Sequence, residues 1–374
     1  ITHPASSTPS GDVLVRVGTS ELVSVGRLPD HWDGRPDVSA NDGCDMNNPD
    51  ENCLSWKLVN PVVIDVGADP LHEQGITGDG VTIAVVDSGV FFNEFLRKVD
   101  DRVGFIDFVG QADFVDEVCT YGGIQFDGYC FVATDEYSED AYGHGSHVAG
   151  IINNSFTDVA SEVAMGVAPD SQILSVRALG EDGTGSYEDV IQSIQFVVDN
   201  KDTFNIRVLN LSLSAYVTTP YFVDPLNRAV EQAWANGIVV VAAAGNTGPG
   251  AESITVPGND PYVITVGGVD SNRTPGYWAD DILPSWSATG PTLDGFAKPD
   301  VLAPGMNVVS WMHRDYAAPG NSARLVQRHP DYSHNATFFR MNGTSMATAV
   351  TSGVIALMLQ AQPELTPDQV KFRL

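Results

Sequence analysis

Basic side chains are scarce in this sequence. Its 374 residues include 19 Lys and Arg against 48 Asp and Glu, which gives a formal net charge of −29 at pH 7. A surface with this excess of negative charge repels nucleic acids and anionic lipid headgroups, so we expect neither as a partner. The acidity fits a salty habitat, and it fits a merely well-solvated surface equally well.

Long hydrophobic runs are missing too. The longest apolar run, Gly237 to Gly245, is far shorter than the roughly 20 residues that cross a bilayer, so we expect no membrane span. The chain begins at Ile1 rather than Met and shows no signal peptide, which suggests a processed or trimmed product. Internal repeats and low-complexity tracts are also lacking.

Cysteine is sparse, with four residues in two close pairs inside loops rich in Gly, Asp and Asn. The pairs lack the C-x-x-C spacing of zinc sites. Four cysteines allow three connectivities, and we predict the local bridges Cys44–Cys53 and Cys119–Cys130 because they close the shortest loops. Paired thiols in an acidic, lysine-poor chain favour a secreted or extracellular protein.

The first 60 residues differ from the rest of the chain. Segments 12–17 and 21–25 predict two short strands, and segment 37–53 is a loop dense in Asp and Asn. That loop suggests calcium but fails the EF-hand pattern, because Asp42 occupies the position where a Gly makes the sharp turn. We interpret residues 1–60 as an N-terminal extension with a disulfide loop.

Residues 61–374 are predicted to form the main domain, in which strand-like and helix-like segments alternate. The continuous β-branched run from Val81 to Val86 is typical of a strand covered on both faces. Further strands are expected at 172–179, 206–212, 238–244 and 262–266, and helices at 186–200 and 225–236. This alternation predicts a doubly wound α/β fold, with a mostly parallel sheet and helices on both faces. Functional groups in such a fold gather at the carboxyl ends of strands.

Several side chains that could take part in catalysis or ligand binding lie at the ends of these elements. Asp87 ends the first strand without the G-x-G-x-x-G of a dinucleotide site, and Asn246 follows the strand at 238–244. His144 stands between glycines at the start of a probable helix, and no H-E-x-x-H motif accompanies it; His147 is interpreted as a packed helix residue. Ser345, flanked by small residues, opens an apolar helix whose N-terminus favours an anion, although Ser and Thr also cap ordinary helices.

Asp, His, Asn and Ser in that order and context resemble the subtilisin-like serine proteases (subtilases). The resemblance runs from about Pro61 to the end of the chain, and Ser146 stands where the His motif usually has Thr. The matching segments are Asp87-Ser-Gly89, His144-Gly-Ser-His-Val-Ala-Gly150, Asn210-Leu-Ser-Leu213, Ala243-Ala-Gly-Asn246, Trp286-Ser-Ala-Thr-Gly-Pro291, Lys298-Pro-Asp300, Ala303-Pro-Gly305 and Gly343-Thr-Ser-Met-Ala347.

The resemblance implies a secreted serine endopeptidase that works through an acyl-enzyme. Ser345 would be the nucleophile and His144 the general base, while Asp87 would orient the imidazole and Asn246 would donate to the oxyanion. The residue types suit these roles. A serine hydroxyl needs a base that titrates near neutrality, and that base needs an orienting acceptor. These are the roles that the same residue types have in subtilisin itself.

The resemblance also supplies a substrate cleft. Gly183-Thr184-Gly185 and Ser212-Leu213-Ser214 resemble the two edges that pair with an extended peptide, and Ala243-Ala244-Gly245 resembles a wall of the first side-chain pocket. Ser214 replaces the usual Gly, which would narrow that pocket, and Ala349 replaces the usual Pro after the Ser motif. We expect a broad preference for apolar or aromatic residues before the cut.

Two other functions stay open. Insertions between the motifs could act as gates of a narrow-specificity processing protease, or the chain could be an inactive binding module on the same fold. The intact set of four catalytic residues argues against the inactive module.

The family further implies protein or peptide substrates, a monomer, no cofactor for catalysis and a structural calcium ion. Segment 154–158 resembles a family calcium loop in position, with Asn154 and Asp158 as candidate ligands. An inhibitory prosegment is not evident, although residues 1–30 could be its remnant. Family members usually continue past the equivalent of Leu374, which suggests truncation at the C-terminus.

Overall fold

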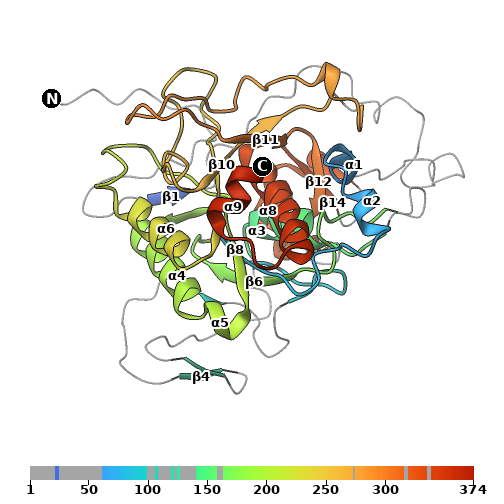
Figure 1. Ribbon diagram of the computed structural model, residues 1–374. Coiled ribbons are helices and arrows are strands. Elements are labelled where there is room, and N and C mark those ends of the chain that lie inside the picture. The colour runs from blue at the N-terminus through green and yellow to red at the C-terminus, as the bar shows by residue number, and fades with distance from the viewer. Residues whose placement is uncertain are drawn as a thin grey trace, which may run out of the picture.

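A seven-stranded parallel sheet forms the centre of the fold (Figure 1). The computed structural model describes residues 61–98, 140–157, 163–272, 274–315, 319–334 and 338–374, and the backbone of short strands at 22–24, 106–107, 119–121 and 124–126. The strand order is β11-β10-β9-β8-β2-β6-β3, and every neighbouring pair is parallel. These strands are β2 (Thr82–Asp87), β3 (Ile106–Asp107), β6 (Gln172–Arg177), β8 (Ile206–Leu211), β9 (Val239–Ala243), β10 (Ile264–Val269) and β11 (Val301–Pro304).

The central strands are buried because their sequences are apolar without alternation. Every residue of β2 and of β9 is buried, as expected for strands that have helices on both sides. The predicted strand at 81–86 is therefore confirmed, with bounds one residue later. The run predicted at 262–266 instead forms β10 from Ile264 to Val269, because its pairing with β11 extends to Val269.

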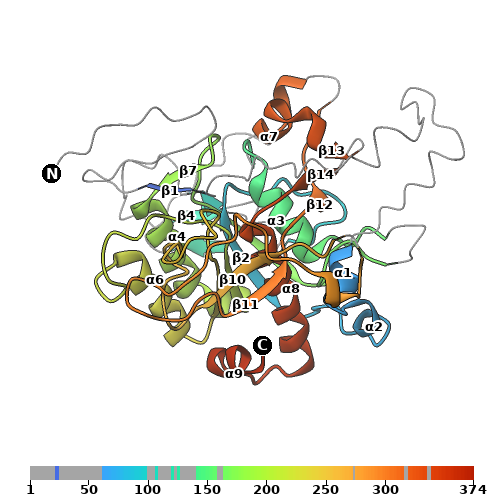
Figure 2. The same cartoon turned by 90° about the horizontal axis from the view of Figure 1, so that it is seen from above.

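Helices cover both faces of the sheet (Figure 2). On one side α3 (His144–Asn153) packs against α8 (Thr344–Ala361), and on the other α4 (Tyr187–Asp199) packs against α6 (Pro225–Ala235). The doubly wound α/β arrangement predicted from the sequence is thus confirmed. The remaining helices are α1 (Pro61–Asp65), α2 (Asp69–His72), α5 (Lys201–Phe204), α7 (Arg324–Arg328) and α9 (Pro367–Arg373), and 3-10 turns lie at Trp278–Asp280, Pro319–Asn321 and Pro330–Tyr332.

Local capping explains where the outer helices start. Ser186 and Asp189 form the predicted capping box at the start of α4, and Asp224 accepts two backbone N–H bonds before Pro225 at the start of α6. Thr366 and Gln369 form a second capping box at the start of α9. Each cap gives backbone N–H groups an acceptor that the helix itself cannot supply.

Smaller sheets surround the core. The strands β12 (Val308–Trp311), β14 (Phe338–Met341) and β13 (Ser333–His334) form an antiparallel sheet, and β4 (Cys119–Tyr121) pairs with β5 (Ile124–Phe126). The strand β1 (Leu22–Ser24) pairs antiparallel with β7 (Thr184–Ser186). Of the two N-terminal strands predicted from the sequence, the second corresponds to β1, and the first lies outside the described residues.

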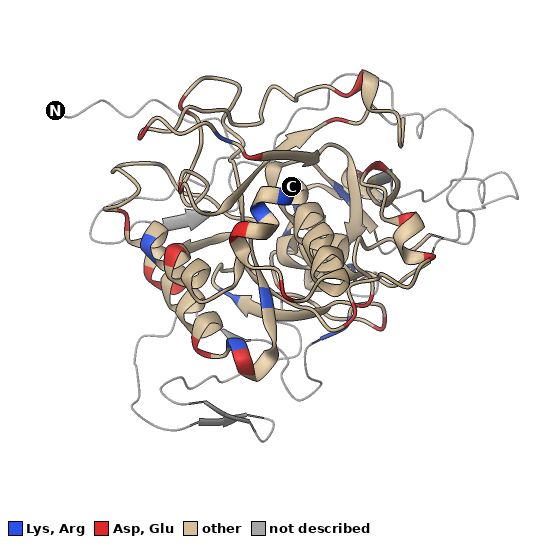
Figure 3. Ribbon diagram, in the orientation of Figure 1, with Lys and Arg blue, Asp and Glu red and all other residues tan. Residues whose placement is uncertain are grey.

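The helix α8 runs through the core. Within the described ranges it is the one helix long and apolar enough to cross a membrane, and 78% of its 18 residues are buried inside the fold. Its N-terminal turn carries Ser345. Figure 3 shows Asp and Glu dispersed over the outer helices and loops, with fewer Lys and Arg among them.

Candidate active site

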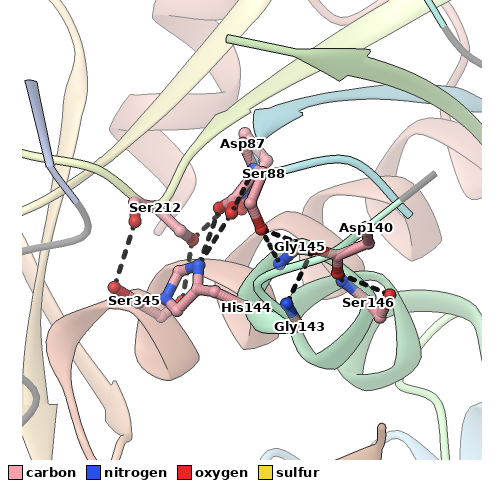
Figure 4. Close-up of polar contacts among 10 residues, drawn as sticks. Asp87, Ser88, Asp140, Gly143, His144, Gly145, Ser146, Ser212 and Ser345 are labelled. Atoms are coloured by element: carbon pink, nitrogen blue, oxygen red, sulfur yellow. Dashed lines mark hydrogen bonds and ion pairs between the residues drawn. The ribbon is translucent and has the colours of Figure 1, made fainter. Parts of the chain in front are cut away.

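Three of the predicted catalytic side chains meet at the carboxyl end of the sheet (Figure 4). Asp87 is the last residue of β2, His144 is the first residue of α3, and Ser345 lies in the first turn of α8. His144 Nδ1 lies 2.8 Å from Asp87 Oδ1 and 2.9 Å from Oδ2. Both side chains are fully buried, so the interaction is shielded from water. Asp87 Oδ1 also accepts the N–H of Ser88 at 2.7 Å, which fixes the carboxylate.

The Ser345 hydroxyl lies beside the imidazole but bonds elsewhere (Figure 4). Its Oγ donates to the carbonyl oxygen of Ser212 at 3.1 Å, and Ser212 Oγ donates to the carbonyl oxygen of Ser345 at 2.9 Å. In the part of the chain that the structure describes, His144 Nε2 has no hydrogen-bond partner. A rotation of Ser345 about its Cα–Cβ bond would redirect Oγ, and catalytic hydrogen bonds of this kind often form fully only with substrate bound.

The Asn246 amide is oriented by the turn that precedes Ser345. Its Oδ1 accepts the backbone N–H of Thr344 at 2.9 Å and the Thr344 hydroxyl at 3.0 Å. The Nδ2 end therefore faces away from these donors. A Cβ at Gly343 would lie 3.3 Å from Nδ2 and 3.6 Å from the sulfur of Met346, so the absent side chain leaves space beside the amide.

The edge segments predicted for substrate binding belong to β7 and to the loop after β8, and Gly183 directly precedes β7. Thr184 and Gly185 belong to β7, and β1 pairs with them, with Val23 opposite Gly185. Ser212, Leu213 and Ser214 follow directly after β8, and Ser212 is the residue that exchanges hydrogen bonds with Ser345.

The predicted pocket wall, Ala243-Ala244-Gly245, begins at the last residue of β9 and continues into the loop that follows it. Gly245 has a φ of +109°, and a Cβ there would come within 2.7 Å of the methyl group of Thr255. Thr255 also donates its hydroxyl to the carbonyl oxygen of Ala244. Sequence reasoning did not find Thr255, because it lies 10 residues from Gly245 on a different loop.

Sequence reasoning also missed a buried carboxylate next to the catalytic pair. Asp140 lies four residues before His144 and accepts bonds from Ser88, Gly143 and Ser146. Burial raises its pKa to about 6, against the lowering effect of those hydrogen bonds. An Asp shortly before a helix start is a capping signal that could have identified it.

His147 is a packed residue, as interpreted from the sequence. Its ring is fully buried, and Nε2 lies 2.9 Å from the carbonyl oxygen of Phe339. Burial lowers its pKa to about 3, so the ring stays neutral.

The predicted metal ligands and cysteines are tested only in part. Asn154 Oδ1 accepts the N–H of Phe156 at 2.9 Å, and Asp158 lies outside the described residues. Within the described ranges no three His, Cys, Asp or Glu side chains form a group that could hold a metal ion. Cys44, Cys53 and Cys130 lie outside the described residues, and only the backbone of Cys119, in β4, is described, so both disulfides stay predictions.

Comparison with known proteins agrees with the geometry. The model of the Subtilase family matches residues 78–374. Serine protease AprX of Bacillus subtilis (strain 168) is 36% identical over 303 residues, which cover 80% of this chain but only 61% of AprX. Subtilisin DY of Bacillus licheniformis is 31% identical over 311 residues, which cover 83% of this chain and 87% of that protein.

Solved structures share the fold. The Sphericase structure superposes with a TM-score of 0.56 at 23% identity, covering 80% of this chain and 83% of that one. The crystal structure of a cold-adapted subtilisin-like serine proteinase superposes with a TM-score of 0.51 at 28% identity, covering 79% of this chain and 81% of that one.

Proposed function

This chain belongs to the subtilase family of serine endopeptidases, and we propose that it hydrolyses peptide bonds through Ser345, His144 and Asp87. The observation that carries this proposal is the buried contact of His144 Nδ1 with both carboxylate oxygens of Asp87, next to Ser345 at the start of α8. With Nδ1–H held by the carboxylate, Nε2 is the nitrogen that accepts a proton.

The reaction proceeds in two halves. Ser345 Oγ attacks the carbonyl carbon of the substrate while its proton moves to His144 Nε2, and the imidazolium then gives that proton to the leaving amine. Water repeats the sequence on the acyl-enzyme: it loses a proton to Nε2, forms the new C–O bond, and Ser345 leaves with the proton. Asp87 stabilises the imidazolium in both halves.

Asn246 serves the oxyanion in this scheme. Negative charge develops on the substrate carbonyl oxygen, where Asn246 Nδ2 and the N–H of Ser345 donate. The fixed position of the amide supports this role, because its Oδ1 is already bonded to the N–H and hydroxyl of Thr344. A donor held in place costs little reorganisation when the charge appears.

The substrate is a protein or peptide in extended conformation, lying between β7 and the segment Ser212–Ser214. An apolar or aromatic side chain precedes the cut, because the Ala243–Gly245 wall and the Thr255 methyl group are apolar. Ser214 and Thr255 make the pocket smaller than one lined by Gly alone. The alternative is a narrow processing protease, and a cleavage profile on a peptide library separates the two.

The N-terminal segment acts as an inhibitor in this proposal. The pairing of β1 with β7 supports it, because β1 then occupies the strand edge that an extended substrate needs. Residues 1–60 are accordingly a regulatory extension of the catalytic domain, 61–374.

We further propose a secreted monomer with the disulfides Cys44–Cys53 and Cys119–Cys130 and a structural calcium ion. Each has a simple test: sedimentation for the monomer, non-reduced peptide mapping for the disulfides, and the melting temperature with EGTA and with excess calcium for the ion. Free thiols, or a melting temperature unaffected by EGTA, would refute the corresponding proposal.

Labelling with a fluorophosphonate tests the catalytic assignment. The unaltered protein should be labelled at Ser345 and should cleave casein, whereas Ser345→Ala should do neither and keep its far-UV circular dichroism spectrum. The inactive binding module predicts no labelling of either protein. Full turnover by Ser345→Ala would refute the proposed mechanism.

A further inference from the structure

The Asp140 side chain is a fully buried carboxylate with four hydrogen-bond donors around it (Figure 4). Its Oδ1 accepts the hydroxyl of Ser88 at 2.9 Å and the backbone N–H of Gly143 at 2.7 Å. Its Oδ2 accepts the backbone N–H of Ser146 at 2.8 Å and the Ser146 hydroxyl at 2.6 Å. Four donors match the acceptor capacity of an ionised carboxylate, which has no proton to give.

These donors belong to both halves of the proposed catalytic pair. Ser88 directly follows Asp87, and its hydroxyl oxygen also accepts the N–H of Gly145 at 3.0 Å. Gly143 and Ser146 lie on either side of His144 in the chain. One carboxylate thus connects the end of β2, which carries Asp87, to the start of α3, which carries His144.

The turn after β2 and the first turn of α3 are packed too closely for either to move freely. A Cβ at Gly145 would lie 2.0 Å from the carbonyl oxygen of Gly89 and 3.2 Å from Asp87 Cβ, so the turn after β2 and the first turn of α3 are in direct contact. A shift of either segment would therefore change the distance between Asp87 and His144.

We propose that ionised Asp140 is a positioning residue that holds Asp87 and His144 at bonding distance through its hydrogen bonds to both segments. The inference rests on the proposed function, because it assigns Asp140 a role through that catalytic pair. Asp140 does not touch the substrate or the reacting atoms in this role; it acts only through Ser88 and the residues beside His144.

The requirement for a carboxylate follows from the two backbone donors. The N–H of Gly143 bonds to one oxygen and the N–H of Ser146 to the other. An Asn at this position would place its NH₂ group against one of these N–H groups in either amide orientation, and neither backbone donor can turn away. Protonation also weakens the arrangement, because the O–H becomes a donor and the carboxyl group loses one of its acceptor positions and its negative charge.

Acid should therefore weaken the hydrogen bonds by which Asp140 holds the two segments together. Burial raises the pKa of Asp140 to about 6, which brings this protonation into a range where the protease can be assayed. The titratable side chains on the described elements that meet Asp140 are Asp87 at the end of β2, Tyr142 in the same turn, and His144 and His147 in α3. Protonation of Asp140 should then contribute to the loss of activity on the acid side of the profile.

The variant Asp140→Asn tests the proposal, with Asp224→Asn as its matched control. Asp224 is also a buried capping carboxylate, but its Oδ1 alone accepts both backbone N–H bonds, so one amide oxygen can replace it. We expect Asp140→Asn to lower kcat about 10²-fold with little change in KM, the loss typical of a misplacement near 1 Å. Asp224→Asn should keep kcat.

The pH profile gives a readout that a purely structural role would not change. The rate of fluorophosphonate labelling should fall more steeply with acid in the unaltered protein than in Asp140→Asn, which lacks the carboxylate that acid protonates. Unchanged kcat and an equally steep profile in Asp140→Asn would overturn the proposal. Ser345→Ala separates the two hypotheses. Turnover by that variant refutes the catalytic assignment, whereas an unchanged kcat in Asp140→Asn refutes only the positioning role of Asp140.

If Asp140→Asn does not fold, Ser88→Ala keeps the proposal testable. This change removes the connection to β2 while leaving both backbone N–H bonds to Asp140 in place. We expect a folded protein with kcat lowered about tenfold, since Ser88 loses its buried hydrogen bonds to Asp140 and to the N–H of Gly145. Unaltered kcat in Ser88→Ala would show that the connection to β2 does not position the pair.

Discussion

The side chain of Asn246 shows how a single amide can be prepared for catalysis. Two donors from Thr344 hold its Oδ1, so its orientation is set before substrate arrives. We expect Asn246→Leu to lower kcat by about 10²–10³-fold, the range that applies to the oxyanion Asn of subtilisin, with little change in KM. Steady-state kinetics on one peptide substrate measures both constants.

A control is needed because Leu also removes the acceptor for Thr344. Thr344→Val keeps the Asn246 amide and removes only the hydroxyl, so it should lose much less activity. A large rise in KM at unchanged kcat in Asn246→Leu would make Asn246 a ground-state binding residue.

Met346 is the second residue whose position predicts an effect on catalysis. It is fully buried, and its sulfur lies 3.6 Å from where a Cβ of Gly343 would lie, close to the Asn246 amide. Oxidation to the sulfoxide makes the side chain bulkier and polar at that point. Mild peroxide should therefore lower kcat, and Met346→Ala should resist this loss.

Mass spectrometry decides the interpretation of Met346. If the peptide containing it carries the sulfoxide and kcat stays constant, the side chain does not affect the reacting centre. If the sulfoxide does not form, burial shields the sulfur and Met346 acts as a core residue of α8.

At the level of residues, sequence could predict those groups that stand in a motif at the end of an element. Asp87, His144, Asn246 and Ser345 were found in this way, and the structure brings the first two into contact. Asp140 was missed because its link to Ser88 spans 52 positions and exists only after the chain has folded.

At the level of elements, the strand β1 makes a prediction about regulation. Val23 lies opposite Gly185 on the edge assigned to substrate. Proline has no N–H to donate and fits poorly inside a paired strand. If β1 competes with substrate, Val23→Pro should lower the apparent KM for peptides and leave kcat unchanged.

A peptide spanning residues 18–28, added in trans, provides the complementary measurement. It should inhibit Val23→Pro competitively, and the same peptide carrying the proline should inhibit less. Equal KM values for Val23→Pro and the unaltered protein would contradict competition by β1.

Packing of α8 against the core makes a second prediction for an element. A Cβ at Gly353 would lie 2.6 Å from Val167 Cβ, and Val167 is fully buried. Overpacking costs about 1–3 kcal/mol, whereas the better helix propensity of Ala returns at most about 1 kcal/mol. Gly353→Ala should therefore lower the free energy of unfolding by about 1–2 kcal/mol in denaturant titrations.

Gly250→Ala is the matched control for this change. Gly250 is exposed, and a Cβ there would meet no atom within 4 Å. Its free energy of unfolding should change by less than about 0.5 kcal/mol. Equal effects of the two substitutions would mean that α8 moves to accommodate the extra methyl group.

Elements were predictable where local chemistry defines them. The buried strand β2 follows from a β-branched run, and α4, α6 and α9 follow from their caps. The pairing of β1 with β7 was not predictable, because it joins segments about 160 residues apart through backbone bonds that carry no sequence pattern.

At the level of the whole molecule, the doubly wound topology assembles the site. Parallel strands end at the same edge, so residues at positions 87, 144, 246 and 345 can meet although they are far apart in the chain. The order of the motifs was sufficient to predict the fold. The family match begins at residue 78, and the division at residue 60 remains a prediction.

The charge of the whole molecule predicts how substrates with different charges respond to salt. With a net charge of −29, the protein should attract cationic peptides and repel anionic ones over distances up to the Debye length, about 10 Å at 0.1 M salt. Raising NaCl from about 0.02 to 0.5 M should therefore lower kcat/KM several-fold for a peptide flanked by Lys, because screening shortens that range. The same peptide flanked by Glu should gain, and a neutral version, the control, should change little. Identical salt responses of all three peptides would mean that the acidic surface affects solubility but not the encounter with substrate.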